Sequence, residues 1–433
     1  MNPVRLPATP ANTDEYRLTG VTLIDGTGAL PVENATVDVA AGRIAAVYSG
    51  TEAPATSAPV YDLTGKFLLP GFIDAHVHFN LNIEAPAAEV EARFPGESAF
   101  EAALVARKTL FAGVTTVRDL GGQDPSLRNA VARAQIIGPR MHLALAALSP
   151  TGGHTDAHLA NGVHSGLSAS VAGVNPVVDS DDEVRKTVRT LVRTGADAIK
   201  VCATGGVSSP SDTPDDVGIG AHQIAIIVEE MAKRAGQPVA AHAQGPVGIK
   251  EAIRGGVSSV EHGYGIDDEG IDLMLEKDTF LVPTLSSALR VPDPALVPDY
   301  LYQKKVKWSA IARERVTAAI AAGVKVATGT DSGICPHGEN LMELKHLVSL
   351  GMSPLDAITA GTRNSAQLLR LDSDLGTVEA GKLADLVITD IDPLADIAAL
   401  ADPANVRVVL QGGRKVKDTD SALPGLDLAH SAF

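Results

Sequence analysis

The stretch FLLPGFIDAHVH, residues 67–78, decides the fold class of this chain. It is a short apolar run that ends in two histidines, and similar apolar or β-branched runs follow it: VTTVRD (114–119), MHLALAAL (141–148), AIKVCA (198–203), VAAHA (239–243), SSVEH (258–262), FLVPTL (280–285) and VKVATGT (324–330). Helical patterns separate most of these runs, for example at 97–111, 181–194, 221–235 and 303–322. Strands that alternate with helices indicate an α/β protein with a parallel sheet, and eight of them favour a closed (β/α)8 TIM-like barrel over an open sheet.

The two ends of the chain differ from this alternating region. Residues 16–61 hold short strand-like runs between turn signals, and LGTVEAGKLADLVITD and VRVVLQGGRKVKD near the C-terminus have the same character. Units of two or three strands are marginal alone, so we expect one small β-sandwich built from both termini. The predicted divisions are 1–66 for the N-terminal part of the sandwich, 67–370 for the barrel, and 371–433 for the C-terminal part and tail.

The composition limits the classes of protein that this chain can be. Its 433 residues are 45% hydrophobic and 20% charged, which is ordinary for globular proteins and excludes disorder and collagen-like repeats. The formal net charge of −16 argues against a nucleic-acid or anionic-membrane partner. Two cysteines provide no disulfide framework, and the sequence has neither a membrane-length apolar run nor a signal peptide. We therefore expect a soluble, cytoplasmic protein.

Side chains with metal-binding chemistry begin at the end of the first expected strand. His76 and His78 are two residues apart, so they point to the same side of a strand and can bind one metal ion. Lys200 lies inside the apolar fourth strand, where an unpaired ammonium is unfavourable. The alternative for Lys200 is a position at the strand rim, from which its ammonium reaches solvent.

Three more of these side chains follow later strands. His242, His262 and Asp331 close the fifth, sixth and eighth expected strands. The C-terminal ends of the strands form the face on which (β/α)8 barrels build active sites. One histidine there can be a core residue, but four at equivalent strand ends indicate a metal site. Imidazole and carboxylate ligands suit zinc and similar divalent ions.

With these residues in place, the sequence resembles the amidohydrolase superfamily. The resemblance rests on PGFIDAHVH, the lysine of the fourth strand, the histidines of the fifth and sixth strands, and TGTDSG, and it covers residues 16–420. The segments GVTTVRDLGG, IKVCATGGV, AAHAQG, VEHG and GTDSG are most similar to the imidazolonepropionase-related branch. That branch includes Xaa-Arg and Xaa-Lys dipeptidases and some urea and carbamate hydrolases.

The resemblance implies a centre with two divalent metal ions, for which zinc is our first choice. The implied ligands are His76, His78, Lys200, His242, His262 and Asp331. The first two histidines and the aspartate would bind the more buried ion, and the other two histidines would bind the second ion. Lys200 would be N6-carboxylated and bridge both ions. The implied reaction is hydrolysis of a C–N bond by metal-activated hydroxide, with Asp331 as proton shuttle, in a homo-oligomer.

Candidate substrate contacts lie in the loops that follow the strands. His154, in the long loop 149–178, is either a hydrogen-bond donor to a substrate oxygen or an exposed loop histidine. Tyr264 donates near the metal or packs, and His337 lies near the expected site without a nameable partner. Arg118 and Arg290 are candidates for holding a substrate carboxylate, although Arg118 can equally form a structural ion pair with its neighbour Asp119.

The expected substrate is a small molecule, such as an N-acyl amino acid or a dipeptide. The alternative is a carbamate, urea or aryl-amide hydrolase that acts on an uncharged aromatic substrate, because few charged residues occupy the loops. A non-catalytic scaffold is a third possibility, which the complete ligand set disfavours.

Overall fold

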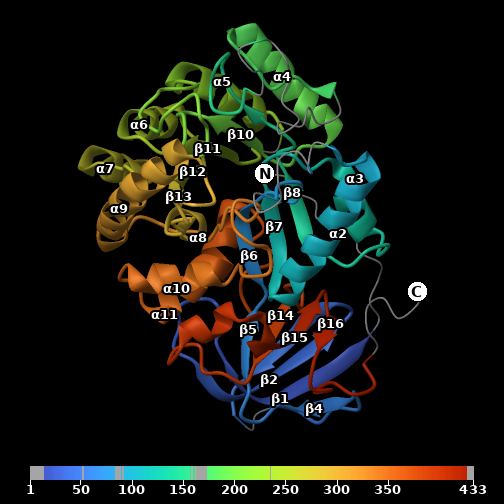
Figure 1. Cartoon of the computed structure of the whole chain (residues 1–433). Coiled ribbons are helices and arrows are strands. Elements are labelled where there is room, and N and C mark those ends of the chain that lie inside the picture. Colours follow the sequence, from blue (N-terminus) through green and yellow to red (C-terminus); the bar gives the residue numbers. More distant parts are fainter. Residues whose placement is uncertain are drawn as a thin grey trace.

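A computed structural model describes residues 14–50, 53–82, 92–156, 173–234 and 236–426, together with positions 89, 158 and 161. Figure 1 shows two regions: strands from both ends of the chain lie together at the bottom of the view, and the remaining strands lie above them with helices around the outside. In the described part of the chain, no helix is both long and apolar enough to cross a membrane.

One sheet combines strands from both ends of the chain. Its order is β16-β15-β14-β5-β1-β2-β3, and β4 also pairs with β1. The strands are β1 (Glu15–Leu23), β2 (Val32–Ala40), β3 (Arg43–Tyr48), β4 (Val60–Asp62), β5 (Phe67–Pro70), β14 (Leu386–Thr389), β15 (Val406–Gln411) and β16 (Arg414–Asp418). The pairs that β1 forms with β4 and β5 are parallel, and the others are antiparallel.

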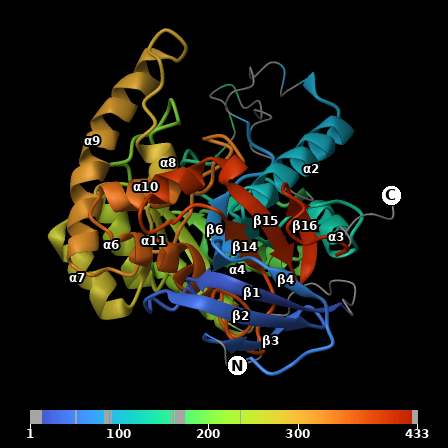
Figure 2. The same ribbon diagram turned by 90° about the horizontal axis from the view of Figure 1, so that it is seen from below.

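This terminal sheet has its own buried core. Leu18, Val37, Leu68, Ile388 and Val408, which come from both ends of the chain, belong to one cluster of buried side chains. Figure 2 shows the blue N-terminal strands beside the red C-terminal strands from below. The expected partnership of the two ends is therefore present. The expected β-sandwich is not confirmed, because the described strands share one hydrogen-bonded sheet.

Two parallel sheets contain most of the expected barrel strands. β6 (Phe72–Val77), β7 (Val114–Asp119) and β8 (Arg140–Leu143) form one sheet, and β9 (Ala147–Leu148), β10 (Ile199–Cys202), β11 (Val239–Ala243), β12 (Ser259–His262) and β13 (Phe280–Val282) form the other. The eighth expected run forms one isolated parallel bridge, Leu281 with Val326, and a second bridge joins Val77 to Ser332 just beyond the run. Among the described residues the hydrogen-bonded ladders therefore give parallel sheets, but no single closed barrel.

Helices connect and cover these strands. They are α2 (Pro95–Phe111), α3 (Pro125–Ala132), α4 (Asp181–Thr194), α5 (Ala221–Ala232), α6 (Pro246–Gly255), α7 (Asp268–Lys277), α8 (Leu285–Ala288), α9 (Asp299–Ala321), α10 (Met342–Ser349), α11 (Pro354–Thr359) and α12 (Ser365–Leu368), with the π-helix Ala360–Asn364 between the last two. α4 shows the local cause: Ser180 and Glu183 form a reciprocal capping box at its start, and Gly195 ends it at a φ of 109°.

Two expected strands are each divided at one residue. Gly71 separates β5 from β6. A Cβ at this position would lie 2.3 Å from Thr115 Oγ1, so the close approach of the two segments requires glycine here. Residues 67–70 consequently pair in the terminal sheet, while β6 pairs with β7. In the third expected strand, Leu145 adopts a φ of 70° between β8 and β9. A left-handed residue cannot continue a β-ladder, so this strand contributes to both parallel sheets.

Candidate metal centre

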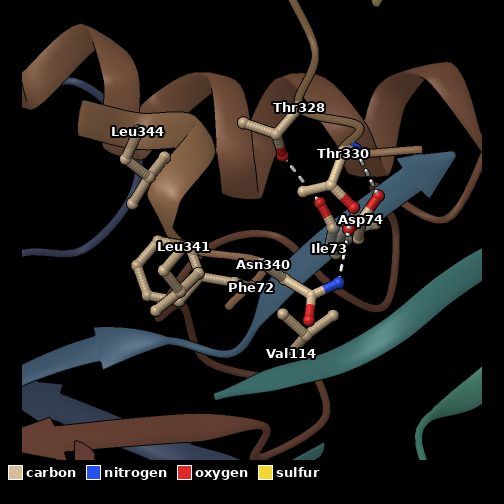
Figure 3. A pocket seen from close by; sticks show the side chains of 9 residues that line it. All are labelled: Phe72, Ile73, Asp74, Val114, Thr328, Thr330, Asn340, Leu341 and Leu344. Atoms are coloured by element: carbon tan, nitrogen blue, oxygen red, sulfur yellow. Dashed lines mark hydrogen bonds between the residues drawn. The ribbon is translucent and has the colours of Figure 1, made fainter. Parts of the chain in front are cut away.

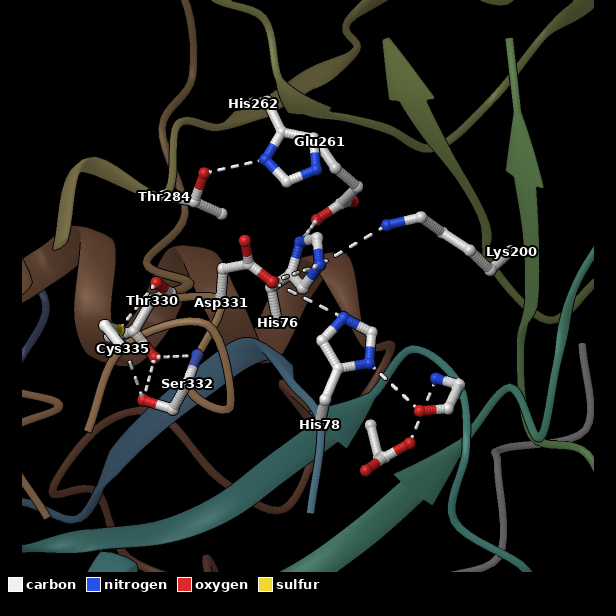
Figure 4. Close-up of polar contacts among 12 residues, drawn as sticks. His76, His78, Lys200, Glu261, His262, Thr284, Thr330, Asp331, Ser332 and Cys335 are labelled. Atoms are coloured by element: carbon white, nitrogen blue, oxygen red, sulfur yellow. Dashed lines mark hydrogen bonds and ion pairs between the residues drawn. The ribbon is translucent and has the colours of Figure 1, made fainter. Parts of the chain in front are cut away.

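The strand ends bring three potential ligands together. His76 and His78 come from the end of β6, and Asp331 follows the eighth expected run (Figure 4). One ligand atom from each of these three residues lies within 4.8 Å of the others. Asp331 Oδ1 is 3.6 Å from His76 Nε2 and 3.4 Å from His78 Nε2. This compact N,N,O set has the ligand types of a zinc-like ion.

Hydrogen bonds at the far side of each ring orient these two histidines. His76 Nδ1 donates to Glu261 Oε2 over 2.8 Å, and His78 Nδ1 donates to the Gly121 carbonyl over 2.9 Å. With Nδ1 carrying the proton, Nε2 of each ring is the nitrogen that points into the site. Burial disfavours a protonated His78, but the hydrogen bond and charge of Asp331 outweigh it and raise the pKa of His78, so without an ion its Nε2 holds a proton where a metal ion would bind. Burial lowers the pKa of His76 well below its usual value, and the nearby Lys200 lowers it further. A neutral imidazole is the form that binds a metal ion.

Lys200 lies in the interior of the site. Its side chain is 3% exposed, so the alternative of a lysine that reaches solvent at the strand rim is wrong. Its Nζ is 3.4 Å from His76 Nε2. Burial lowers the pKa of the Lys200 ammonium, although the charges of Glu261 and Asp331 act in the opposite direction. An amine in this setting is inclined towards the neutral, nucleophilic form.

His242 and His262 form the other side of the site. Their ring centroids are 4.6 Å apart, and the His262 ring is 5.0 Å from the His76 ring. His242 Nε2 donates to the Gly205 carbonyl over 3.0 Å, whereas His262 Nδ1 lies 2.8 Å from Thr284 Oγ1. These contacts leave His242 Nδ1 and His262 Nε2 available as ligand atoms.

The backbone is left-handed at three neighbouring strand ends. The φ angles are 72° at His262, 49° at Thr284 and 61° at Asp331. For residues other than glycine, such conformations cost about 1–3 kcal/mol each and persist only where the surrounding structure imposes them. Two of the three residues carry candidate ligand atoms, and the third binds one of those ligands. These three strained residues therefore lie at the candidate site.

A buried ion pair supports the ligands from within the parallel strands. Glu261 accepts from His76 Nδ1 through one oxygen and from Arg118 Nη2, at 2.8 Å, through the other. Arg118 also donates to the Ala75 carbonyl and is fully buried. Its guanidinium is thus committed to protein groups, so we do not retain Arg118 as a substrate ligand. The structural pair that it forms is with Glu261 rather than with Asp119.

A second buried carboxylate ties the eighth run to β6. Asp74 accepts from Thr330 Oγ1 over 2.6 Å and from Asn340 Nδ2 over 2.7 Å (Figure 3). It also accepts from the His76 backbone N–H over 3.0 Å. The void beside it holds only about 10 Å³, which is the space of one water and no substrate. The role of Asp74 is to fix the distance between His76 and the segment that carries Asp331.

His154 lies within the site, at its His242 side. Its ring stacks on the His242 ring with centroids 4.2 Å apart and an interplanar angle of 19°. Its Nδ1 lies 3.2 Å from Asp212 Oδ2, which leaves Nε2 for another partner. Burial opposes ionisation of Asp212, but the hydrogen bond and charge of His154 outweigh it and lower the pKa of Asp212. Residues 162–172 of the same loop lie outside the described residues.

The other three substrate candidates occupy different surroundings. Tyr264 is buried, and its hydroxyl lies 3.3 Å from Thr284 Oγ1. His337 stacks on Phe79, and its Nε2 donates to the His78 carbonyl over 3.2 Å, beside a cavity of about 130 Å³. Burial lowers the pKa of His337 to about 4. Arg290 is exposed just beyond the end of α8.

Sequence reasoning missed the residues that orient the ligands. Glu261 and Asp74 stand within the quoted motifs and Asp212 lies five residues after one of them, but their partners lie far away in the sequence. A carboxylate inside a buried strand, as in SSVEH, was the one available signal for Glu261. The chemistry of the donors fits divalent metal ions: imidazoles whose orienting contacts leave one ring nitrogen facing the site, one ionised carboxylate, and a buried lysine.

Comparisons with known proteins agree with this arrangement. The model of the amidohydrolase family matches residues 67–416. Ochratoxinase from Aspergillus niger is 33% identical over 438 residues, which cover 96% of this chain and 90% of that protein. Imidazolonepropionase from Rhizorhabdus wittichii is 28% identical over 410 residues, which cover 86% and 92%. The crystal structure of a Xaa-Pro dipeptidase with methionine bound in its active site has a TM-score of 0.85 and 31% identity, over 93% of this chain and 100% of that one.

The family match extends over most of the chain and includes every residue of the candidate centre. The TIM-like α/β barrel that the resemblance implied is the architecture of this family, and the parallel sheets agree with it. The chain therefore belongs to the amidohydrolase family and is a hydrolase that acts on carbon–nitrogen bonds.

Proposed function

We propose that this protein is a metal-dependent amidohydrolase that cleaves the amide bond of an N-acyl amino acid or dipeptide. The observation that carries this proposal is the convergence of His76, His78 and Asp331 beside the buried Lys200. The similarity to a Xaa-Pro dipeptidase, whose structure contains bound methionine, supports an amino-acid product. The alternative to this substrate class is an uncharged carbamate, urea or aryl amide.

The centre would hold two divalent ions, with zinc as first choice. His76, His78 and Asp331 would bind one ion, and His242 and His262 the other. When bound, such ions lower the pKa of a water and polarise a carbonyl group. The amine of Lys200 would add to CO2 with loss of a proton, and the resulting carbamate anion would bridge the ions. Its burial, with no ion pair to a carboxylate among the described residues, supports this modification.

Asp331 is the proposed proton carrier. Burial alone would raise its pKa, but the hydrogen bond from His78 and the nearby positive charges, among them Lys200, outweigh burial and lower it. The carboxylate is therefore ionised at neutral pH and can take a proton from the attacking water. It would then give this proton to the nitrogen of the leaving amine as the C–N bond breaks.

His154 is the proposed donor to the carbonyl oxygen of the substrate. Its Nδ1 is held by Asp212, so its Nε2 is the nitrogen that can face a substrate. Negative charge develops on the carbonyl oxygen during attack, and a fixed donor at that position stabilises it.

We also propose that the protein is a cytoplasmic homo-oligomer. The expectation of an oligomer is supported by large apolar side chains on and beside α2, where Phe94, Phe100 and Leu104 are 76%, 79% and 47% exposed. An exposed apolar group of this kind is typical of an interface. Analytical ultracentrifugation of the wild type and of a Phe100→Ser variant tests the proposal, and a monomeric wild type would contradict it.

The function is tested with the zinc-loaded protein and an Asp331→Asn variant. We expect the wild type to hydrolyse N-acyl amino acids or dipeptides in a mass-spectrometric screen that also contains neutral carbamates, ureas and amides. Asp331→Asn should retain metal by elemental analysis and lose turnover by about 10²- to 10⁴-fold, the usual contribution of a general acid–base group. An Asp331→Asn variant that retains both metal and activity would contradict the proton-carrier role.

A further inference from the structure

The helix α9 carries a lysine on the face that packs against the candidate site. Its buried side chains include Trp308, Ala312 and Val316, which are spaced four residues apart. Lys305 precedes Trp308 by three residues and therefore lies on the same face. Two side chains of this face, Trp308 and Ala312, form a small apolar cluster with Val207, Tyr264 and Ala288. Figure 2 shows α9 extending along one flank of the molecule beside α8.

The Lys305 ammonium reaches the corner that holds His262. Its Nζ donates to the Ser287 carbonyl over 2.7 Å. The Ser287 backbone N–H bonds the carbonyl of Thr284, whose hydroxyl is 2.8 Å from His262 Nδ1. Lys305 is thus linked to a candidate metal ligand through one short turn of chain.

Among the described residues, no carboxylate pairs with the Lys305 ammonium. In the part of the chain that the structure describes, Ser287 is the hydrogen-bond partner of Lys305, and no carboxylate oxygen lies within 4.0 Å of its Nζ. The ammonium has three donors, so two remain available. Burial lowers the pKa of Lys305 and Arg290 lowers it further, while Asp331 and Cys335 act in the opposite direction.

We propose that Lys305 binds the carboxylate of the amino acid that leaves when the substrate is cleaved. This inference rests on the proposed function and narrows its substrate class to molecules with a free carboxylate next to the scissile nitrogen. Asp331 has to meet that nitrogen to protonate it. In an amino acid the carboxylate carbon lies about 2.5 Å beyond the nitrogen, across two bonds. Lys305 is a half-buried cation held at the corner of α8 that contacts His262 through Thr284, so it is placed to receive this carboxylate.

The other cationic candidates fit this role less well. Arg118 is fully buried and already paired with Glu261, and Arg290 is exposed at the end of α8. If Lys305 only capped α8, its hydrogen bond to the Ser287 carbonyl would be sufficient, and the role would not require a positive charge. A substrate carboxylate would supply the missing counter-charge, and a charge-assisted hydrogen bond of this kind is strong.

The test compares an N-acyl amino acid with its carboxamide, which has the same shape and no charge. For Lys305→Met we expect the KM for the acid to rise about 10- to 100-fold, the range of a charge-assisted hydrogen bond, and the KM for the carboxamide to stay within about twofold. Lys305→Arg should restore most of the loss because it restores the charge. The control is Lys307→Met, a 60% exposed lysine on the same helix, which should leave both KM values unchanged.

A second measurement needs no variant. The free amino acid should inhibit the wild type at least about 10-fold better than its amide, because only the acid can occupy the Lys305 position. Equal losses for acid and carboxamide in Lys305→Met, or equal inhibition by the two products, would overturn the inference while leaving the hydrolase function intact. Cleavage of neutral carbamates and ureas alone would overturn both this inference and the proposed substrate. A wild type that hydrolyses none of these compounds would count against the proposed function itself.

Discussion

At the scale of single residues, the site depends on carboxylates that never face the substrate. Glu261 is completely buried and joins His76 to Arg118, so it fixes one ligand while neutralising one cation. Asp212 performs a similar task for His154. Such outer groups decide which nitrogen of each imidazole carries the proton, and hence which nitrogen is available for chemistry.

The first prediction concerns Glu261→Gln. The amide keeps the volume but leaves Arg118 without a counter-charge and weakens the acceptor for His76. We expect zinc affinity to fall about 10- to 100-fold, the usual effect of losing an outer hydrogen-bond partner of a histidine ligand. The free energy of unfolding should fall by about 3–5 kcal/mol, as for a broken buried ion pair. Competition with a zinc chelator and urea denaturation measure the two quantities, and unchanged zinc affinity would contradict the assignment.

The second prediction separates Asp212 from a merely structural carboxylate. His154→Asn should lower kcat by about 100-fold if its Nε2 stabilises the developing oxyanion. Asp212→Asn should lower kcat by a smaller factor, because His154 remains but is no longer oriented. In the double variant, Asp212→Asn should add almost nothing to the effect of His154→Asn, since both act through one ring. Additive losses of kcat with normal metal content would refute this coupling.

At the scale of residues, the sequence could predict the candidate ligands but not the groups that orient them. His76, His78, His242, His262 and Asp331 were found because each follows a strand, and strand ends converge in this architecture. The partners could not be found in this way, because the contact between His76 and Glu261 spans 185 positions and depends on how β6 and β12 face each other. Lys305 was missed because a lysine in an amphipathic helix normally faces solvent.

At the scale of elements, the short helix α8 is held by a carboxylate from a distant helix. Glu343 of α10 accepts from the backbone N–H groups of Leu285 and Ser286, both over 2.7 Å. It thereby caps the first turn of α8 and fixes the corner that contains Thr284. Burial raises the pKa of Glu343 to about 8, although these hydrogen bonds lower it.

The third prediction is a pH dependence of stability caused by Glu343. Between about pH 4.5 and 8 the folded protein retains a proton on Glu343 that the unfolded chain has lost. The free energy of unfolding therefore falls as pH rises through this window, by at most about 1.4 kcal/mol per pH unit. Glu343→Gln should be less stable at pH 5.5 but show a flatter slope up to pH 7.5 in urea denaturation.

The control for this prediction is Glu339→Gln, which changes an exposed glutamate just before α10. Its slope should equal that of the wild type. If Glu343→Gln also keeps the wild-type slope, Glu343 does not titrate in this window.

Element boundaries show where periodicity alone is insufficient. The pattern of residues 67–78 predicts one strand, yet this strand divides between two sheets at Gly71, a position where Thr115 leaves no room for a Cβ. Likewise, the third expected strand is divided at Leu145, where the backbone is left-handed. Both divisions are caused by tertiary contacts, which a single run of residues does not contain.

At the scale of the whole molecule, the candidate ligands join elements that are distant in sequence. Metal binding should therefore stabilise the entire fold, because ions bind the folded state and not the dispersed ligands of the unfolded chain. This is the fourth prediction. With free zinc at about 100 times its dissociation constant, the gain is about 2.7 kcal/mol, visible as a higher Tm in calorimetry than in chelated protein. His78→Ala should reduce the gain, whereas His222→Ala, a 78% exposed histidine, should keep it.

The sheet shared by both termini has a consequence for how the protein is made. β5 is flanked by β1 on one side and by β14 on the other, and β14 starts only at residue 386. While the ribosome is still producing the chain, the β14 side of Phe67–Pro70 is an unpaired strand edge directly ahead of the histidines of β6. Open edges attract other chains. A nonsense mutation shortly before residue 386 would leave every candidate ligand encoded. We nevertheless expect the truncated protein to aggregate in cells and to bind chaperones, so the defect would be one of folding and not of catalysis.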